Sequence, residues 1–144
     1  MGRREIREQI FKLLFRIEFN EEQEMPQQKE FFFEPDGEEE SPRFKTRDIA
    51  EITEKFDGIV GKIPEIDGMI NEKASGWNTK RMGKVDLTIL RLAVYEIIFD
   101  ENIPAGVAIN EAVELAKAYG QDESPAFING VLAKLVPSQT GEGN

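Results

Sequence analysis

The 144-residue chain contains no cysteine and no histidine. The absence of cysteine excludes a disulfide framework and a thiolate metal site. The absence of histidine removes the commonest general base and the commonest zinc ligand, so serine–histidine and cysteine–histidine catalysis are excluded. Carboxylate, lysine and tyrosine chemistry remain open, but no pair of carboxylates stands out, and no Walker or dinucleotide-binding motif occurs. We therefore predict that the protein is not an enzyme and uses no metal or cofactor.

Long apolar runs are also lacking. The longest, such as residues 92–95 and 97–99, are far too short to span a bilayer. The first seven residues are mostly charged or polar, and the uninterrupted apolar region of a secretory signal does not follow them. We expect a soluble, cytoplasmic protein with no membrane partner.

The acidic charge is concentrated in one stretch of the chain. The formal net charge is −10, and residues 21–40 contribute nine acids against a single base. The rest of the chain has 19 acidic and 17 basic residues, so it is nearly balanced and does not exclude a nucleic-acid partner. Prolines and glycine interrupt the acidic stretch, which predicts a mobile insertion over residues 21–42. The phenylalanines at positions 31–33 either attach this loop to the protein body or form a short strand.

Elsewhere, apolar residues recur at helical spacing. The pattern predicts helices over residues 3–19 and 44–62, from Pro64 onward, and over 77–83, 85–99, the stretch between Pro104 and Gly120, and 124–135. Residues 85–99 are apolar on almost every side, which is typical of a central, buried helix. The prediction is therefore an all-α protein with about seven helices, forming a single domain over residues 1–136 with a disordered tail at 137–144.

Three arginines, Arg3, Arg4 and Arg7, stand at the start of the first predicted helix. The helix dipole makes this end positive, so each cation costs roughly 0.3–1 kcal/mol there. One interpretation is that they serve a partner, for which the phosphate backbone of a nucleic acid is the obvious candidate. The alternative is ordinary solvated charge, partly offset by Glu5 and Glu8.

Residues 73–91 form a second basic stretch, which is either a phosphate-binding patch or an ordinary charged face. Its basic residues are Lys73, Lys80, Arg81, Lys84 and Arg91. Since Arg91 lies in the most apolar helix, we expect it to pair internally, with Glu96 or Glu114, because an unpaired buried charge is costly.

Two single residues leave similar alternatives. Trp77, the only tryptophan, either stacks on a base or packs against the end of a helical bundle, and packing is the commoner role. Gly130 lies within a predicted helix, where glycine costs roughly 1 kcal/mol relative to alanine. The usual compensation is the close approach of another helix or of a ligand backbone.

Three long strings carry a resemblance to a known family. They read WNTKRMGKVDLTILRLAVYE from Trp77, IPAGVAINEAVELAKAYG from Ile103 and SPAFINGVL from Ser124. Together with the arginine-bearing first helix, they resemble the NusB transcription-antitermination family. The resemblance covers both ends of the chain, but not residues 21–42.

This resemblance implies an all-helical fold of two three-helix bundles packed at a steep angle. It also implies an RNA-binding, non-catalytic adaptor in transcription antitermination. Such an adaptor binds boxA single-stranded RNA of ribosomal RNA transcripts together with ribosomal protein S-ten (NusE). Other antitermination factors and RNA polymerase complete the assembly.

The resemblance further implies roles for individual residues. Arg3, Arg4 and Arg7 match the basic stretch that contacts RNA. Glu123, which replaces a usual Asp, and Phe127 match further RNA-binding positions. Phe15 and Asp86 match the face that meets S-ten.

Two alternatives remain open beside this interpretation. One is a protein-interaction module without RNA contacts, and the other is a carboxylate-dependent hydrolase. The same fold also occurs as the N-terminal domain of ribosomal RNA cytosine methyltransferases. We do not expect that activity, because the chain has no cysteine nucleophile and ends soon after the predicted bundle.

Overall fold

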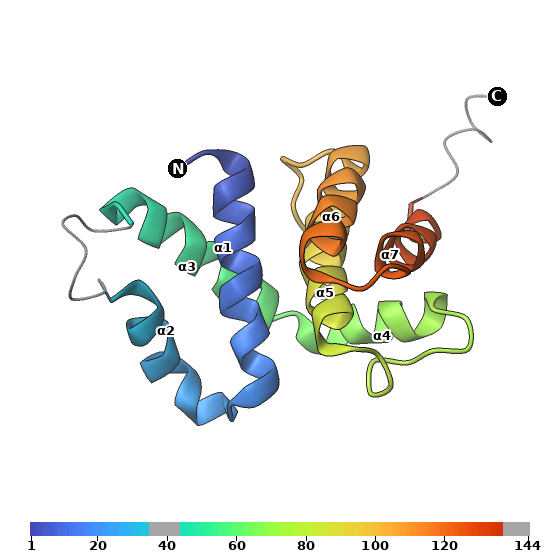
Figure 1. The fold of residues 1–144 in the computed structure, drawn as a ribbon. Helices are drawn as coiled ribbons and strands as arrows, with labels where there is room; N and C mark the ends of the chain where they lie inside the picture. Colours follow the sequence, from blue (N-terminus) through green and yellow to red (C-terminus); the bar gives the residue numbers. More distant parts are fainter. Residues whose placement is uncertain (35–43, 137–144) are drawn as a thin grey trace. The chain divides into compact units, whose positions relative to one another are not determined.

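The computed structural model describes residues 1–34 and 44–136, and the regular elements in this part of the chain are all helices (Figure 1). It contains seven α-helices and two short 3₁₀ helices. The prediction of an all-α protein with about seven helices is confirmed. The chain divides into two compact units, Met1–Gly61 and Lys62–Asn144. The predicted tail at 137–144 lies outside the described residues. None of the helices described is long and apolar enough to cross a membrane.

The first unit is built on two helices that pack against each other, α1 (Arg3–Phe15) and α3 (Thr46–Val60) (Figure 1). A 3₁₀ turn, Arg16–Phe19, extends α1. Amphipathic spacing explains the packing, since the apolar residues of each helix fall on one buried face. The most buried of these side chains are Ile10, Leu13, Leu14, Ile52 and Ile59.

The third helix of this unit, α2 (Met25–Phe33), lies where the sequence predicted a mobile loop. That prediction is wrong for residues 22–33, because Glu22–Glu24 is also helical, as a 3₁₀ turn. Aromatic packing explains the difference. The rings of Phe32 and Phe33 lie 5.7 and 5.2 Å from that of Phe44, which is buried. The expected attachment to the body is confirmed, through a helix and not a strand. Residues 35–43 of the predicted insertion lie outside the described residues.

The second unit contains α4 (Ile63–Lys73), α5 (Lys84–Ile98), α6 (Ala105–Tyr119) and α7 (Ser124–Ala133). Helix α5 packs against each of the other three, so the prediction that it is the central helix is confirmed (Figure 1). The predicted helix over residues 77–83 is wrong, since this segment forms turns between α4 and α5. The core of the unit consists of fully buried aliphatic side chains, among them Ile66, Ile70, Ile89, Leu90, Ile128 and Leu132.

Of the two explanations offered for Gly130, the close approach of another helix is not found. It lies within α7 and is exposed, and a Cβ atom built on it would meet no atom within 4 Å. No helix of the described residues therefore approaches this glycine closely, and the expected compensation within the protein is absent there.

Asp48, near the start of α3, is buried and gives the first unit a pH-dependent contact. The backbone N–H of Lys45 donates to its carboxylate at 3.0 Å and is the main cause of a pKa below the ordinary value of 3.8. Burial opposes this shift, and the N-terminal ammonium, 3.5 Å away, supports it.

We expect this contact to contribute stability above pH 3.8, the ordinary pKa, and to lose it as the pH falls through the lower folded-state pKa. The melting temperature of the protein should therefore fall more steeply below about pH 4 than that of an Asp48→Asn variant. Thermal unfolding monitored by circular dichroism across this range tests the expectation. Glu54→Gln, at an exposed site on the same helix, is the control. Parallel curves for the unchanged protein and Asp48→Asn would contradict the assignment.

Candidate nucleic-acid interface

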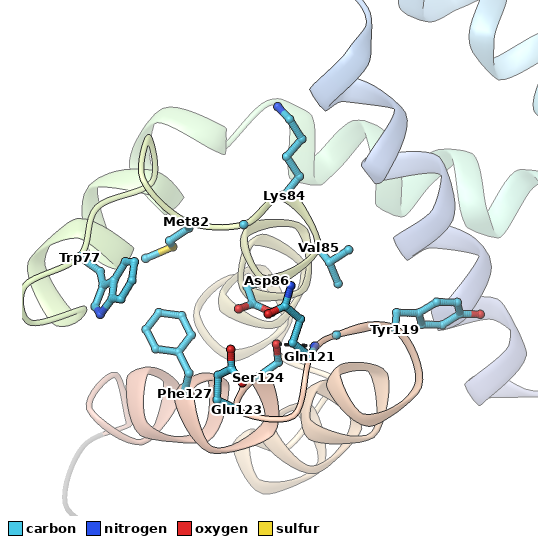
Figure 2. A pocket seen from close by; sticks show the side chains of 12 residues that line it. Trp77, Met82, Lys84, Val85, Asp86, Tyr119, Gln121, Glu123, Ser124 and Phe127 are labelled. Carbon is cyan, nitrogen blue, oxygen red and sulfur yellow. Dashed lines mark hydrogen bonds between the residues drawn. The ribbon is translucent and has the colours of Figure 1, made fainter.

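The second unit contains a pocket of about 500 Å³ (Figure 2). It lies where the turns before α5, the first turn of α5, the α6–α7 connection and the first turn of α7 meet. Aromatic rings and carboxylates both line it. Its shape and chemistry depend chiefly on Trp77, Lys84, Asp86, Gly120, Glu123 and Phe127.

Trp77 and Phe127 form the aromatic wall of the pocket. Their ring centroids are 6.0 Å apart with an interplanar angle of 68°, an edge-to-face arrangement (Figure 2). Phe127 is half-buried, whereas 51% of Trp77 is exposed. The packing role favoured for Trp77 from the sequence is therefore confirmed in part: one side of the ring packs on Phe127, and about half of the residue is exposed.

Hydrogen bonds fix the turns before and after Trp77 in the chain. The backbone N–H of Trp77 donates to the backbone carbonyl of Ala74 at 2.8 Å. Gly76 lies between them, with a φ of +79° that favours glycine. The Asn71 side chain accepts the N–H of Thr79 at 2.8 Å.

Two further contacts fix the same segment. The side-chain oxygen of Asn78 accepts the backbone N–H groups of Lys80 and Arg81 at 3.0 and 3.2 Å. Such side-chain bonds to the local backbone compete with a helix, which explains why the predicted helix is replaced by turns. The Lys134 ammonium of the segment after α7 donates to the Ser75 hydroxyl at 3.1 Å. Hydrogen bonds therefore fix the backbone of the turns on which the half-exposed Trp77 ring lies.

Asp86 and Glu123 supply the carboxylates of the pocket (Figure 2). Asp86 is half-buried in the first turn of α5, and Glu123 is exposed just before α7. Both positions suit a negative charge, because the helix dipole is positive at the N-terminal end. The family resemblance implies RNA contacts for Glu123 and Phe127 and a protein contact for Asp86. The structure places all three in one pocket.

The α6–α7 connection forms the floor between these groups and is tightly built. A Cβ atom on Gly120 would lie 2.6 Å from the Cβ of Ser124 and 2.8 Å from the carbonyl oxygen of Ala116. The Ser124 hydroxyl in turn accepts the N–H of Gln121 at 3.0 Å. Glycine is therefore required here by space, and it lets the chain turn directly into α7.

The other residues for which the family resemblance implies a role belong to the first unit. Arg3, Arg4 and Arg7 lie in the first two turns of α1, with Arg3 and Arg4 exposed and Arg7 half-buried. Phe15 ends α1 and is half-buried, with its ring 5.0 Å from that of the exposed Phe19.

The second basic stretch divides into two parts. Lys80, Arg81 and Lys84 are exposed around the turns before α5. Arg91, by contrast, makes a double contact with Asp67 of α4, at 2.9 and 2.8 Å. The expected internal pairing of Arg91 is confirmed, although Asp67 is not one of the partners predicted from the sequence.

The helical fold and the aromatic-and-carboxylate pocket define a class of small, all-helical proteins with two units. Within this class the assignment is specific, because the model of the NusB family matches residues 4–137. The chain belongs to the NusB family.

Relatives described as transcription antitermination protein NusB agree. The protein of Agathobacter rectalis is 52% identical over 135 residues, which cover 94% of this chain and 99% of the relative. The protein of Lachnoclostridium phytofermentans is 48% identical over 136 residues, covering 94% and 99%.

Solved structures show the same fold. NusB of T. maritima superposes with a TM-score of 0.82 at 31% identity, covering 99% of this chain and 98% of the other. A chain in a complex of the antitermination factors NusB and NusE with double-stranded RNA superposes with a TM-score of 0.71 at 25% identity, covering 92% and 94%. A chain in the crystal structure of a plectonemic RNA supercoil gives 0.72 at 26% identity, with 92% of each chain covered.

Proposed function

We propose that this protein is a transcription antitermination factor that binds boxA RNA of ribosomal RNA transcripts together with NusE. It acts as a non-catalytic adaptor in the cytoplasm, within the antitermination complex on RNA polymerase. The observation that carries the proposal is its likeness, over 92% of its length, to a chain of the solved complex of NusB and NusE with RNA.

Two surfaces supply the proposed RNA contacts. Arg3, Arg4 and Arg7 contact phosphates, which explains cations at a helix end where the dipole disfavours them. Glu123 and Phe127 contact bases from the pocket, since ring faces and carboxylates bind bases in unpaired RNA. The arginines provide affinity and the pocket provides selectivity.

Phe15 and Asp86 are the proposed contacts with NusE. The ring of Phe15 contacts that of Phe19, which is 61% exposed. An exposed aromatic side chain of this kind suits a protein interface. Asp86 lines the same pocket as Glu123, so we place the NusE contact next to the RNA contact. Exchange of Asp86 for lysine should therefore affect both partners.

The proposal is tested by titrating labelled boxA-type RNA with the protein, with and without NusE, at several salt concentrations. We expect binding that NusE strengthens and that salt weakens. Each phosphate neutralised on a single strand adds about 0.7 to the slope of log affinity against log salt. Replacing Arg3, Arg4 and Arg7 by Gln should therefore flatten this slope by about 2.

A matched control removes the same charge elsewhere, by replacing Lys55, Lys62 and Lys117 with Gln. This control should leave the slope close to that of the unchanged protein. No binding to boxA-type RNA in the presence of NusE would sink the proposal. Retained binding to NusE alone would then favour a protein-interaction module without RNA contacts.

A further inference from the structure

Trp77 is the feature of the pocket that the proposed residues leave unexplained. Half of it is exposed, yet its segment is fixed by the hydrogen bonds of Asn71, Asn78 and Lys134. A large ring held in water by a bonded segment is unfavourable for stability alone, because its burial would be favourable. The same arrangement favours binding, since a ring that is already fixed loses little freedom when a ligand stacks on it.

The charges around Trp77 indicate which part of a nucleic acid the pocket accepts. Figure 2 shows the carboxylates of Asp86 and Glu123 beside the aromatic wall, with the side chain of Lys84 directed away from them. Two carboxylates repel a phosphate and accept N–H groups. The cations Lys80 and Arg81 are exposed on the turns outside the pocket, where a phosphate backbone can pass. This separation favours an unpaired base inside and phosphates outside.

The acceptor groups also rank the four bases. Guanine presents two adjacent N–H donors, N1–H and the N2 amino group, which match the two oxygens of one carboxylate. Adenine and cytosine place an acceptor nitrogen beside their amino group, and uracil places carbonyl oxygens on both sides of its single N–H. When such an acceptor faces a carboxylate oxygen, no hydrogen bond can form between them, and binding is weakened. Guanine is therefore the base with the best match.

We propose that Trp77 is an RNA-binding residue which, with Phe127, holds one unpaired guanine whose N–H edge faces Glu123. The inference rests on the proposed RNA-binding function and adds a residue and a base preference to it. Trp77 supplies stacking, and Glu123 supplies the selection.

The test uses the full chain with NusE and a labelled boxA-type RNA. Trp77→Ala should weaken binding by about 5- to 150-fold, the usual effect of losing one stacked base. Trp77→Phe should restore most of the loss, because phenylalanine keeps a ring face. The matched control is Phe31→Ala, since Phe31 is 48% exposed but lies on α2, outside the pocket.

The position of the base is found with RNAs that lack one base at a time. One abasic position should weaken binding to the unchanged protein and cause little further loss with Trp77→Ala. At that position guanine should bind better than adenine or cytosine, and uracil least well. Glu123→Gln should reduce this preference, because an amide offers only one acceptor oxygen.

The outcomes separate the two proposals. If the unchanged protein binds no boxA-type RNA, the proposed function fails. If it binds but Trp77→Ala binds equally well, or if no abasic position is coupled to Trp77, the inference about Trp77 is overturned. It is also overturned if Trp77→Ala weakens NusE binding equally in the absence of RNA. Should Trp77→Ala fail to fold, Trp77→Phe with the abasic series decides, since coupling to one position must persist.

Discussion

Gly120→Ala should destabilise the protein by about 1–3 kcal/mol, the usual cost of forcing an extra carbon into a packed site. The added Cβ would lie 2.6 Å from the Ser124 Cβ and 2.8 Å from the Ala116 carbonyl oxygen. The carbonyl belongs to the backbone of α6 and cannot rotate away, so the connection between α6 and α7 must shift. Thermal unfolding should show a melting temperature lowered by roughly 3–10 °C.

Gly68→Ala is the matched control for this substitution. Gly68 lies within α4, and a Cβ atom there would meet nothing within 4 Å. Alanine is the better helix former, so we expect this variant to gain about 0.5–1 kcal/mol. The same exchange should thus have opposite signs at the two positions. Equal melting temperatures for the two variants would show that the tight contact at Gly120 does not affect the stability of the fold.

Asp67→Ala should cost about 1.5–3 kcal/mol, the range for hydrogen bonds to charged groups. The Asp67 carboxylate accepts two bonds from Arg91 at 2.9 and 2.8 Å, and only 12% of the Arg91 side chain is exposed. Removing the carboxylate leaves the largely buried guanidinium on the central helix with fewer acceptors, which costs more than replacing both partners by apolar residues. Urea unfolding measures the loss.

The control for the ion pair is Glu114→Ala, which removes the exposed partner of Lys117 on α6. Those side chains are 42% and 61% exposed, and surface pairs contribute well under about 1 kcal/mol. A double-mutant cycle of Asp67→Ala with Arg91→Met should give a clear coupling energy. A cost for Asp67→Ala no larger than that for Glu114→Ala would show that burial adds nothing to the Arg91 contact.

Much of the fold could be predicted from the sequence, because six of the seven helices bury a regular apolar stripe. Helix α2 was missed, since its stretch is rich in acid and contains Pro26. Two facts that depend on the fold reverse this interpretation. Pro26 lies in the first turn, where its missing N–H costs nothing. The acids Glu22 and Glu24 precede the positive end of the helix, where they stabilise it.

The expected total of about seven helices was reached partly through compensating errors. The segment 77–83 was predicted as a helix and forms turns, while α2 was not predicted and exists. Contacts with other parts of the chain contribute to both outcomes. Phe44 packs against α2, and Lys134 binds the turns near Ser75.

The candidate site was predicted in part. The family resemblance named Glu123, Phe127 and Asp86, but their meeting in one pocket depends on how α5 and α7 pack. The same is true of Trp77 and Phe127, which are 50 positions apart in the chain and in contact in the fold. Sequence patterns indicate which residues are unusual, whereas tertiary packing decides which of them act together.

The division into two units has a spectroscopic consequence. Trp77 and both tyrosines, Tyr95 and Tyr119, lie in the second unit, so the first unit holds phenylalanine as its only aromatic side chain. Tryptophan and tyrosine emission from the native protein therefore originates in the second unit, and its change during unfolding follows that unit alone. Far-ultraviolet dichroism follows the helices of both. Recording the two signals on one sample distinguishes a single cooperative transition from the separate melting of a first unit that contributes nothing to this emission.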